Sequence, residues 1–290
     1  MPELPEVETV RRKIEFAAKG QKIAEVHADE GDRFLFAFAP WREVKATLEG
    51  ARIRGVGRRG KYFWLELDRR PWLLLHLGMT GNVEIRRRVR KGAHEKSWGG
   101  LSLWSNRGKE KGEGNPLWFC RLLIVTENGT EIAMTDPRRF GRVWLAEEPL
   151  LHPRVKKLGF DPLVKFPTAT ELRALLARRK APIKAVLLDQ KLFAGVGNWI
   201  ADEILFQARI APKRLASGLS MSEVTRLRGR TLSVIKKAVS VGADYERFPK
   251  TWLFHHRWGK NKEARTSQRQ EIIYEEVGGR TTAWVPAVQK

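Results

Sequence analysis

The sequence contains little cysteine, too few acidic residues to balance its basic ones, and no long apolar run. A single cysteine, Cys120, among 290 residues excludes an internal disulfide and any zinc site built on several thiolates. No apolar run approaches the roughly 18 residues of a membrane span, and no secretory signal pattern opens the chain. We therefore expect neither a spanning segment nor secretion.

The excess of basic residues indicates a large anionic partner. Fifty-five Lys and Arg face 33 Asp and Glu, which leaves a formal net charge of +22. Nucleic acid is the first expectation for such a charge, although binding to a ribosome or a membrane surface would need the same sign. Eleven Trp and 13 Phe favour a packed core over an unfolded basic tail.

The first half of the chain has the pattern of one helix followed by short strands. Apolar residues at helical spacing run from Glu3 to Lys19, and Gly20 ends the pattern. Short β-type runs follow at 22–29, 51–59, 61–68, 71–78, 82–88, 119–135 and 141–148. Such strands are typical of a sandwich or barrel, and Asn128-Gly129 predicts a hairpin. The polar stretch from 86 to 116 predicts a long surface loop, although its "RRRVRK" run leaves a nuclear-import signal open.

The second half has a helical pattern that ends in a β-hairpin. Thr168 with Glu171, and Ser220 with Glu223, have capping-box spacing ahead of amphipathic runs. Short strands around "IIYEEVGGRTTAWVP" predict one hairpin packed on these helices. The length of the chain and this change of pattern predict two domains and an α+β fold class.

A glycine turn in the second half is a candidate phosphate site. Gly195 and Gly197 precede an apolar helix that begins near Asn198, where free backbone amides attract an anion. Glycines also let a backbone approach a ligand closely. A purely structural turn is the plainer explanation of this motif taken alone.

Two further turns carry side chains of the kind that wedge into a base stack. Met79 lies between two glycines on one turn, and Arg138 with Phe140 lies on another. Partial burial against neighbouring strands explains either turn taken singly.

The opening stretch "MPELPEVETVRR" allows two interpretations. Pro5 and the glutamates at positions 3, 6 and 8 suit the first turn of a helix, whose dipole is positive at that end. If the initiator methionine is removed, Pro2 becomes a secondary amine at the chain terminus, and an amine is a nucleophile toward a sugar aldehyde. These twelve residues alone favour the helix start.

Six motifs occur in an order that resembles one enzyme superfamily. They are "PELPEVETVRR", "RRGKYFWLEL", "HLGMTG", "TDPRRFGR", "AGVGNWIADE" and "GGRTTAW". Over nearly the whole chain they resemble the formamidopyrimidine-DNA glycosylase and endonuclease VIII superfamily. The "PELPEVET" start is similar to the formamidopyrimidine branch, and "GGRTTAWVPAVQ" is similar to its plant and fungal members. In those members a metal-free hairpin replaces a four-cysteine zinc finger.

The resemblance implies a division of the chain and a set of partners. It implies an N-terminal helix with a β-sandwich at 1–148, a helical domain with a helix-two-turn-helix at 149–250, and a zincless β-hairpin finger at 251–290. No cofactor and no metal are expected, because the second Cys-x-x-Cys pair falls on Val285 and Val288. The implied partner of this monomeric protein is double-stranded DNA with oxidised bases or abasic sites. We expect it in the nucleus, with an organelle as the alternative.

The resemblance also assigns roles to individual residues. It implies that Pro2 is the imine-forming nucleophile, that Glu3 is the catalytic acid and that Glu6 supports this site. It also implies that Lys61 assists base removal and β-elimination and that Arg280 assists δ-elimination. His76, Asn198 and Arg280 match phosphate-clamping residues, Lys184 matches a residue near the lesion pocket, and Gly195 and Gly197 join the DNA-binding set through the turn described above. Met79, Arg138 and Phe140 match the side chains that fill the gap left by an extruded nucleotide.

The implied activity is that of a bifunctional DNA glycosylase and abasic-site lyase on oxidised bases. The segment between Val241 and Lys260 is shorter than the family's lesion-capping loop. We therefore expect release of formamidopyrimidines and hydantoins and poor activity on planar 8-oxoguanine. An endonuclease VIII-like preference for oxidised pyrimidines and a catalytically idle DNA-binding relative are the alternatives.

Overall fold

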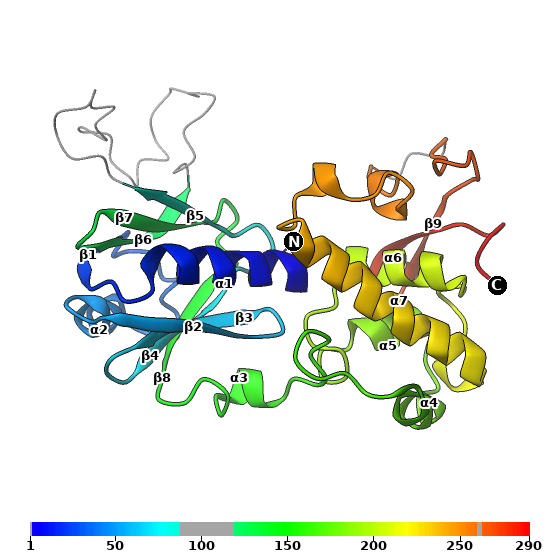
Figure 1. The fold of residues 1–290 in the computed structure, drawn as a ribbon, viewed down its shortest axis with the longest axis horizontal. Coiled ribbons are helices and arrows are strands. Elements are labelled where there is room, and N and C mark those ends of the chain that lie inside the picture. Colours follow the sequence, from blue (N-terminus) through cyan, green and yellow to red (C-terminus); the bar gives the residue numbers. More distant parts are fainter. Residues whose placement is uncertain (1, 88–118, 260–262) are drawn as a thin grey trace. The chain divides into compact units, whose positions relative to one another are not determined.

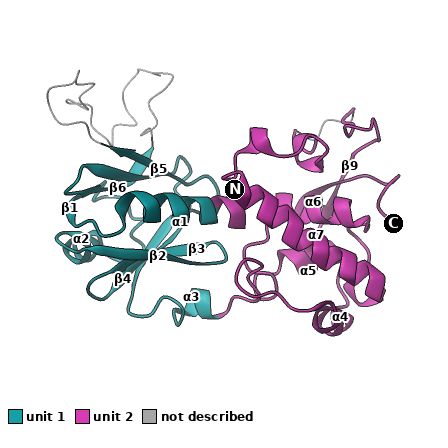
Figure 2. Ribbon diagram, in the orientation of Figure 1, with its two compact units in different colours: residues 1–2, 7–156 teal, residues 3–6, 157–290 magenta. Residues whose placement is uncertain are grey.

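The structure is a computed structural model that describes residues 2–87, 119–259 and 263–290. These residues form two compact units, one of residues 1–2 and 7–156 and the other of residues 3–6 and 157–290 (Figure 2). Nearly all of the predicted loop at 86–116 lies outside the described residues. None of the described helices is long and apolar enough to cross a membrane. The fold class is α+β, as predicted.

The described residues of the first unit form two four-stranded antiparallel sheets that share one core (Figure 1). One sheet has the order β1-β6-β7-β5 and the other has the order β2-β3-β4-β8. Its strands are β1 (Ile23–Ala28), β2 (Ile53–Arg59), β3 (Tyr62–Leu67), β4 (Trp72–His76), β5 (Asn82–Arg87), β6 (Cys120–Thr126), β7 (Thr130–Thr135) and β8 (Arg142–Ala146). Its helices are α1 (Leu4–Ala18), α2 (Trp41–Leu48) and α3 (Pro153–Lys156). The predicted strands are confirmed, while α2 is a helix that the sequence analysis did not predict.

Helix α1 packs its apolar face into the core of the first unit. Val7, Val10 and Ile14 are buried there at the predicted helical spacing. On the polar face, the buried carboxylate of Glu8 accepts hydrogen bonds from the guanidinium groups of Arg11, Arg12 and Arg58. Burial raises the pKa of Glu8, but the hydrogen bonds from these three arginines and the charge of Arg58 outweigh it and lower the pKa to about 2. Glu8 therefore fastens α1 to strand β2.

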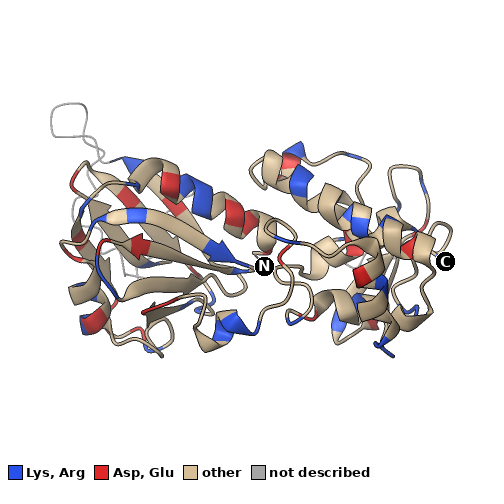
Figure 3. Ribbon diagram, turned by 60° about the horizontal axis from the view of Figure 1, so that its bottom comes forward, with Lys and Arg blue, Asp and Glu red and all other residues tan. Residues whose placement is uncertain are grey.

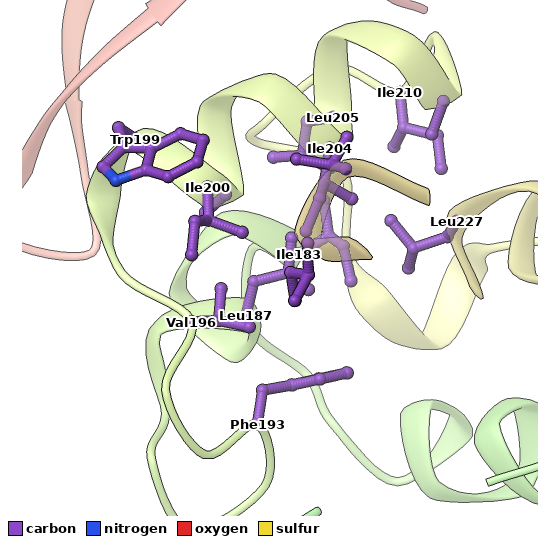
Figure 4. Close-up of a cluster of buried hydrophobic side chains, with 14 of the residues drawn as sticks. Ile183, Leu187, Phe193, Val196, Trp199, Ile200, Ile204, Leu205, Ile210 and Leu227 are labelled. Atoms are coloured by element: carbon purple, nitrogen blue, oxygen red, sulfur yellow. The ribbon is translucent and has the colours of Figure 1, made fainter. Parts of the chain in front are cut away.

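The second unit is mainly helical. Its elements are α4 (Ala169–Ala177), α5 (Ile183–Leu188), α6 (Asn198–Ala208), α7 (Met221–Ser240), the 3-10 turns η1 (Ala216–Gly218), η2 (Tyr245–Arg247) and η3 (Leu253–His255), and strands β9 (Ile273–Val277) and β10 (Arg280–Trp284). Thr168 and Ser220 make reciprocal capping boxes with Glu171 and Glu223, which confirms both predicted helix starts. Apolar side chains of α5, α6 and α7 form the core shown in Figure 4.

Strands β9 and β10 form the predicted C-terminal hairpin. They pair antiparallel from Arg280 opposite Val277 to Trp284 opposite Ile273. Gly278 and Gly279 make the two-residue turn, and both have positive φ, as this type of hairpin turn requires. A Cβ on Gly278 would lie 2.8 Å from Cβ of Ala185, so the turn lies closely against α5.

Candidate functional site

Two turns of the first unit are tied together by the buried carboxylate of Asp136. Its Oδ1 accepts hydrogen bonds from Thr80 Oγ1 at 2.7 Å and from the Arg138 amide at 3.2 Å. Its Oδ2 accepts a hydrogen bond from the Gly141 amide at 2.6 Å. Because one side chain binds both turns, the turn after β4 and the turn before β8 are fixed side by side.

These two turns carry the three predicted gap-filling residues. The ring of Phe140 is 43% exposed, and the guanidinium of Arg138 lies 4.9 Å from its centroid. Met79 is partly buried and follows Gly78, whose φ is +66°. A Cβ on Gly78 would lie 2.4 Å from the carbonyl carbon of Phe140, so only glycine allows this approach. The structure thus brings the three side chains onto adjoining turns, while their insertion into DNA stays a prediction.

His76, at the end of β4, has the arrangement of a neutral hydrogen-bond donor. Its Nδ1 accepts a hydrogen bond from the Gly78 amide at 3.0 Å, which leaves Nε2 to carry the proton of the neutral ring. Burial, together with the positive charges of Lys61, Arg154 and Arg142, lowers the pKa of His76 to about 4. At neutral pH the ring can therefore donate through Nε2 to an acceptor such as a phosphate oxygen.

Lys61 lies on the two-residue turn between β2 and β3. Arg58 donates a hydrogen bond to the carbonyl of Gly60 at 3.0 Å, and its Nε donates to Glu8 at 2.9 Å. Gly60 has a φ of +57°, which suits the tight connection. The turn that carries Lys61 is thereby connected to helix α1.

In the second unit, Glu3 occupies the N-terminus of helix α6. Its Oε1 accepts a hydrogen bond from the Trp199 amide at 3.0 Å, and its Oε2 accepts one from the Ile200 amide at 3.2 Å. The first amides of a helix have no partner within the helix, and the dipole there favours a negative charge. Glu3 is fully buried and supplies the acceptor that the N-cap residue, Gly197, cannot.

The predicted glycine turn is closed by the start of the chain itself. A Cβ on Gly197 would lie 2.2 Å from the carboxyl carbon of Glu3. Gly195 has a φ of +90°, and a Cβ there would lie 2.6 Å from the side chain of Leu4. Both glycines therefore allow residues 3 and 4 to lie against the turn. A DNA phosphate at Gly195 and Gly197 stays a prediction.

The carboxylate of Glu6 connects the backbone of Glu3 to the side chains of two aromatic residues. Its Oε2 accepts a hydrogen bond from the Glu3 amide at 2.9 Å. Its Oε1 accepts hydrogen bonds from Trp199 Nε1 at 3.2 Å and from the Tyr245 hydroxyl at 2.9 Å. Burial raises the pKa of Glu6, while hydrogen bonds that include the Tyr245 hydroxyl oppose the rise. Trp199 and Tyr245 were not predicted as site residues, because no local motif connects positions so far apart in sequence.

Asn198 and Arg280 are brought to the same part of the second unit. The Asn198 side-chain amide donates a hydrogen bond to the carbonyl of Thr281 at 2.9 Å and so joins α6 to β10. Arg280 begins β10 and is exposed. Among the described residues, the buried Oδ1 of Asn198 has no hydrogen-bond partner. A phosphate clamp formed by Asn198 and Arg280 stays a prediction.

Lys184 is an internal residue. Its ammonium group is fully buried and makes an ion pair with Asp202, which also accepts hydrogen bonds from Arg257 Nε at 3.0 Å and from the Ala283 amide at 3.3 Å. Burial lowers the pKa of Lys184, and the charge of Asp202 partly opposes this. The network joins α5, α6 and β10, so it fixes the hairpin that carries Arg280. A contact of Lys184 with a lesion stays a prediction.

The hairpin region is held by apolar packing. Leu253, Ile272, Ala283 and Val285 form a buried cluster there. Within the parts of the chain that the structure describes, no three His, Cys, Asp or Glu side chains are grouped to hold a metal. Cys120 is buried in β6, and burial raises the pKa of its thiol to about 12.

Two models of known protein domains match most of the chain. Residues 1–143 match the family model described as formamidopyrimidine-DNA glycosylase N-terminal domain, and residues 158–249 match the formamidopyrimidine-DNA glycosylase H2TH domain. The chain is therefore a DNA glycosylase of base excision repair, and it belongs to the formamidopyrimidine-DNA glycosylase family.

Individual relatives support this assignment. The formamidopyrimidine-DNA glycosylase of Arabidopsis thaliana is 37% identical over 290 residues, which is 100% of this chain and 71% of that protein. The enzyme of Paracoccus denitrificans is 36% identical over 83% of this chain and 79% of its own length. A crystal structure of the Lactococcus lactis enzyme, noncovalently bound to DNA with an abasic site, has a TM-score of 0.78 at 28% identity and covers 99% of both chains.

Proposed function

We propose that this chain is a bifunctional DNA glycosylase and abasic-site lyase that removes oxidised bases through an imine at Pro2. One observation carries the proposal. The peptide group that joins Pro2 to Glu3 is held by Glu6, while the Glu3 carboxylate is held by two amides of α6. An acid fixed directly beside a terminal amine is the arrangement that this chemistry needs.

The reaction begins with the Pro2 nitrogen after removal of the initiator methionine. A free α-amine has an ordinary pKa of about 7.7 to 8.0, so an appreciable neutral fraction exists at physiological pH. Its lone pair attacks C1′ of the extruded deoxyribose, the C1′–base bond breaks, and the base leaves with that electron pair and takes up a proton. Ring opening then gives an iminium between Pro2 and C1′.

Glu3 and the cationic residues complete the reaction. The Glu3 carboxylate is held by two amides of α6, and it can accept and return protons as the sugar ring opens. Loss of the C2′ proton breaks the C3′–O bond in β-elimination, and a second elimination breaks the C5′–O bond. Lys61 assists base release and β-elimination, and Arg280 assists δ-elimination. Hydrolysis of the iminium releases the enzyme.

Lesion-containing duplex DNA is the proposed partner. The charge of +22 favours it, and Figure 3 shows Lys and Arg on both units. Related glycosylases have been crystallised with DNA that contains an abasic site, formamidopyrimidine-dG or carbocyclic 8-oxo-G. His76 with Nε2–H, exposed Arg280 and the turns of Met79 and Phe140 are suited to bind phosphates and to replace an extruded nucleotide.

The proposed lesion preference depends on the segment that follows α7. Its side chains Phe248, Trp252 and Phe254 are buried against the core of the second unit, so none of these three rings closes over a flipped base. Planar 8-oxoguanine stacks well and needs such contacts, whereas ring-opened formamidopyrimidines and non-planar hydantoins already disturb the stack. We therefore propose efficient release of the latter two and weak release of 8-oxoguanine.

Borohydride trapping on abasic-site DNA tests the proposed chemistry. The mature protein is expected to form a covalent adduct, because borohydride reduces an imine between protein and sugar. A protein that carries an extra, uncleaved N-terminal residue should bind the same DNA without being trapped. Trapping of the extended protein at the wild-type rate would assign the attack to another amine. No trapping of either form would favour an idle DNA-binding relative.

A panel of lesions separates the substrate alternatives. Single-turnover excision of each base opposite cytosine, at one salt concentration, should rank formamidopyrimidine and hydantoin above 8-oxoguanine. A ranking led by oxidised pyrimidines would favour the endonuclease VIII-like alternative.

A further inference from the structure

Two exposed phenylalanines of the first unit each lie beside a guanidinium group. Phe34 and Phe38 are 54% and 53% exposed. The guanidinium of Arg142 lies 6.0 Å from the centroid of Phe34, and that of Arg154 lies 5.1 Å from the centroid of Phe38. Two exposed aromatic rings that are grouped with guanidinium groups on one segment suit an interaction site, and the paired cations favour an anionic partner.

The segment that presents both rings is held in place. Asp32 Oδ1 accepts hydrogen bonds from the amides of Phe34 at 3.0 Å and Leu35 at 3.1 Å. The carbonyl of Leu35 accepts a hydrogen bond from the Val143 amide at 3.2 Å, which fixes the segment to β8. The two rings are therefore presented in a defined position rather than on a free loop.

A continuous row of aromatic rings connects this surface to His76. Phe38 stacks on Trp144 at 5.6 Å and 17°, and Trp144 lies 5.9 Å from Tyr62. Tyr62 in turn lies 4.7 Å from His76.

The same connection appears in the electrostatics. Arg142 and Arg154, which lie beside Phe34 and Phe38, both help to lower the pKa of His76. The exposed rings are thus an extension of the surface where a DNA phosphate is proposed to bind.

We propose that Phe34 and Phe38, with Arg142 and Arg154, form an accessory site for the unpaired bases of a single strand that continues from the bound duplex. Every base has a π-face, so stacking on exposed rings tolerates any sequence, and guanidinium groups neutralise the adjoining phosphates. Duplex DNA offers no free base faces along its length. The site therefore distinguishes a duplex with an overhang, flap or gap from a continuous duplex. This inference rests on the proposed function, the binding of DNA.

Binding to matched DNA substrates tests this site. Fluorescence anisotropy at one salt concentration compares three duplexes with a central abasic-site analogue: one blunt, one with an oligothymidine overhang, and one with an overhang of propyl phosphate units that lack bases. The duplex with the oligothymidine overhang should bind about tenfold more tightly than the other two duplexes. Stacking of a base on an aromatic side chain raises binding affinity by about this factor. Equal affinity for both overhangs, or no gain over the blunt duplex, would overturn the proposal.

Variants identify the rings that are responsible. The double substitution Phe34→Leu and Phe38→Leu keeps apolar volume but removes the stacking faces, and it should abolish the gain from the bases. Phe16→Leu is the matched control, because Phe16 is 95% exposed on α1 and has no place in the aromatic row. Retention of the tenfold gain in the double variant would reject the site.

Two further results keep the proposals separate. Arg154→Gln should reduce the salt dependence of overhang binding by about one unit in slope. Failure to bind the blunt duplex would contradict the proposed function, while loss of only the overhang gain would contradict only the accessory site.

Discussion

Carboxylates organise the candidate site in both units, but they have different roles. In the first unit a carboxylate positions other side chains, and in the second unit the carboxylates themselves are proposed to act. In the first unit Asp136 is buried and holds two turns, while Phe140, a proposed gap-filling side chain, stays 43% exposed. In the second unit the buried carboxylate of Glu3 and the partly buried carboxylate of Glu6 are themselves the proposed functional groups. A change at the proposed gap-filling residues should therefore disturb the fold less than a change at the proposed acid, which is buried in it.

The largest effect is expected from Glu3→Gln, which changes chemistry more than packing. A glutamine can accept one of the two α6 amides but cannot carry a proton, so excision should fall about 1000-fold. Single-turnover kinetics with a formamidopyrimidine duplex measure the change, and chemical denaturation should show a loss of only about 1 kcal/mol.

Glu8→Gln is the matched control for that substitution. It removes a buried carboxylate bound by three arginines, so it should lower stability with little effect on the rate of excision. The lowered pKa of Glu8, about 2, means that its contribution to stability is full above about pH 4.5 and is lost as the pH falls toward 2. If Glu8→Gln slows excision as strongly as Glu3→Gln does, the loss in Glu3→Gln cannot be assigned to the chemistry of Glu3.

Asp136→Ala should have the next largest effect, on stability. The substitution leaves Thr80 and the amides of Arg138 and Gly141 without their acceptor, at a cost of about 3 kcal/mol. Urea denaturation measures the loss. If the variant is as stable as the wild type, the turns are held by something other than this carboxylate.

Met79→Ala should slow excision from duplex DNA by about tenfold, because the void left by the extruded nucleotide is no longer filled. Single-stranded substrate should be cut at nearly the wild-type rate, and the salt dependence of binding should not change, since no phosphate contact is lost. Met221→Ala, which changes an exposed methionine on α7, is the control. Equal losses on both substrates would make Met79 a packing residue.

Tyr245→Phe should have the smallest effect, a loss of a few fold. Its hydroxyl donates to Glu6 and opposes the rise of the Glu6 pKa, so its removal raises that pKa further. The acid limb of the pH–rate profile should move to higher pH, because Glu6 becomes protonated earlier as the pH falls. Tyr274→Phe, which removes a hydroxyl bound to the His256 carbonyl, should leave the profile unchanged. An unmoved profile in Tyr245→Phe would exclude this positioning role.

Local patterns were sufficient for most of the secondary structure. The strands, both capping boxes and the C-terminal hairpin follow from alternation, spacing and turn residues. Helix α2 was missed because its eight residues show only a short apolar pattern. The order of strands within each sheet could not be predicted, since β1 pairs with β6 across a long stretch of chain.

The site was predictable only in part. Resemblance indicated Glu3 and Glu6, but the hydrogen bonds from Trp199 and Tyr245 arise from contacts across nearly 200 residues or more. The need for glycine at 195 and 197 was predicted, with a phosphate as the expected neighbour. The structure places Glu3 and Leu4 against these two glycines, which no local pattern could indicate, and the phosphate stays a prediction.

The central claim is that the Pro2 nitrogen, fixed beside Glu3, is the nucleophile. The most direct test is to trap the mature protein on abasic-site DNA with borohydride, digest the adduct and locate the modified residue by mass spectrometry. The account predicts a deoxyribose remnant on the N-terminal peptide, attached at Pro2. A remnant on Lys61 or on any other lysine, with an unmodified N-terminus, would contradict it.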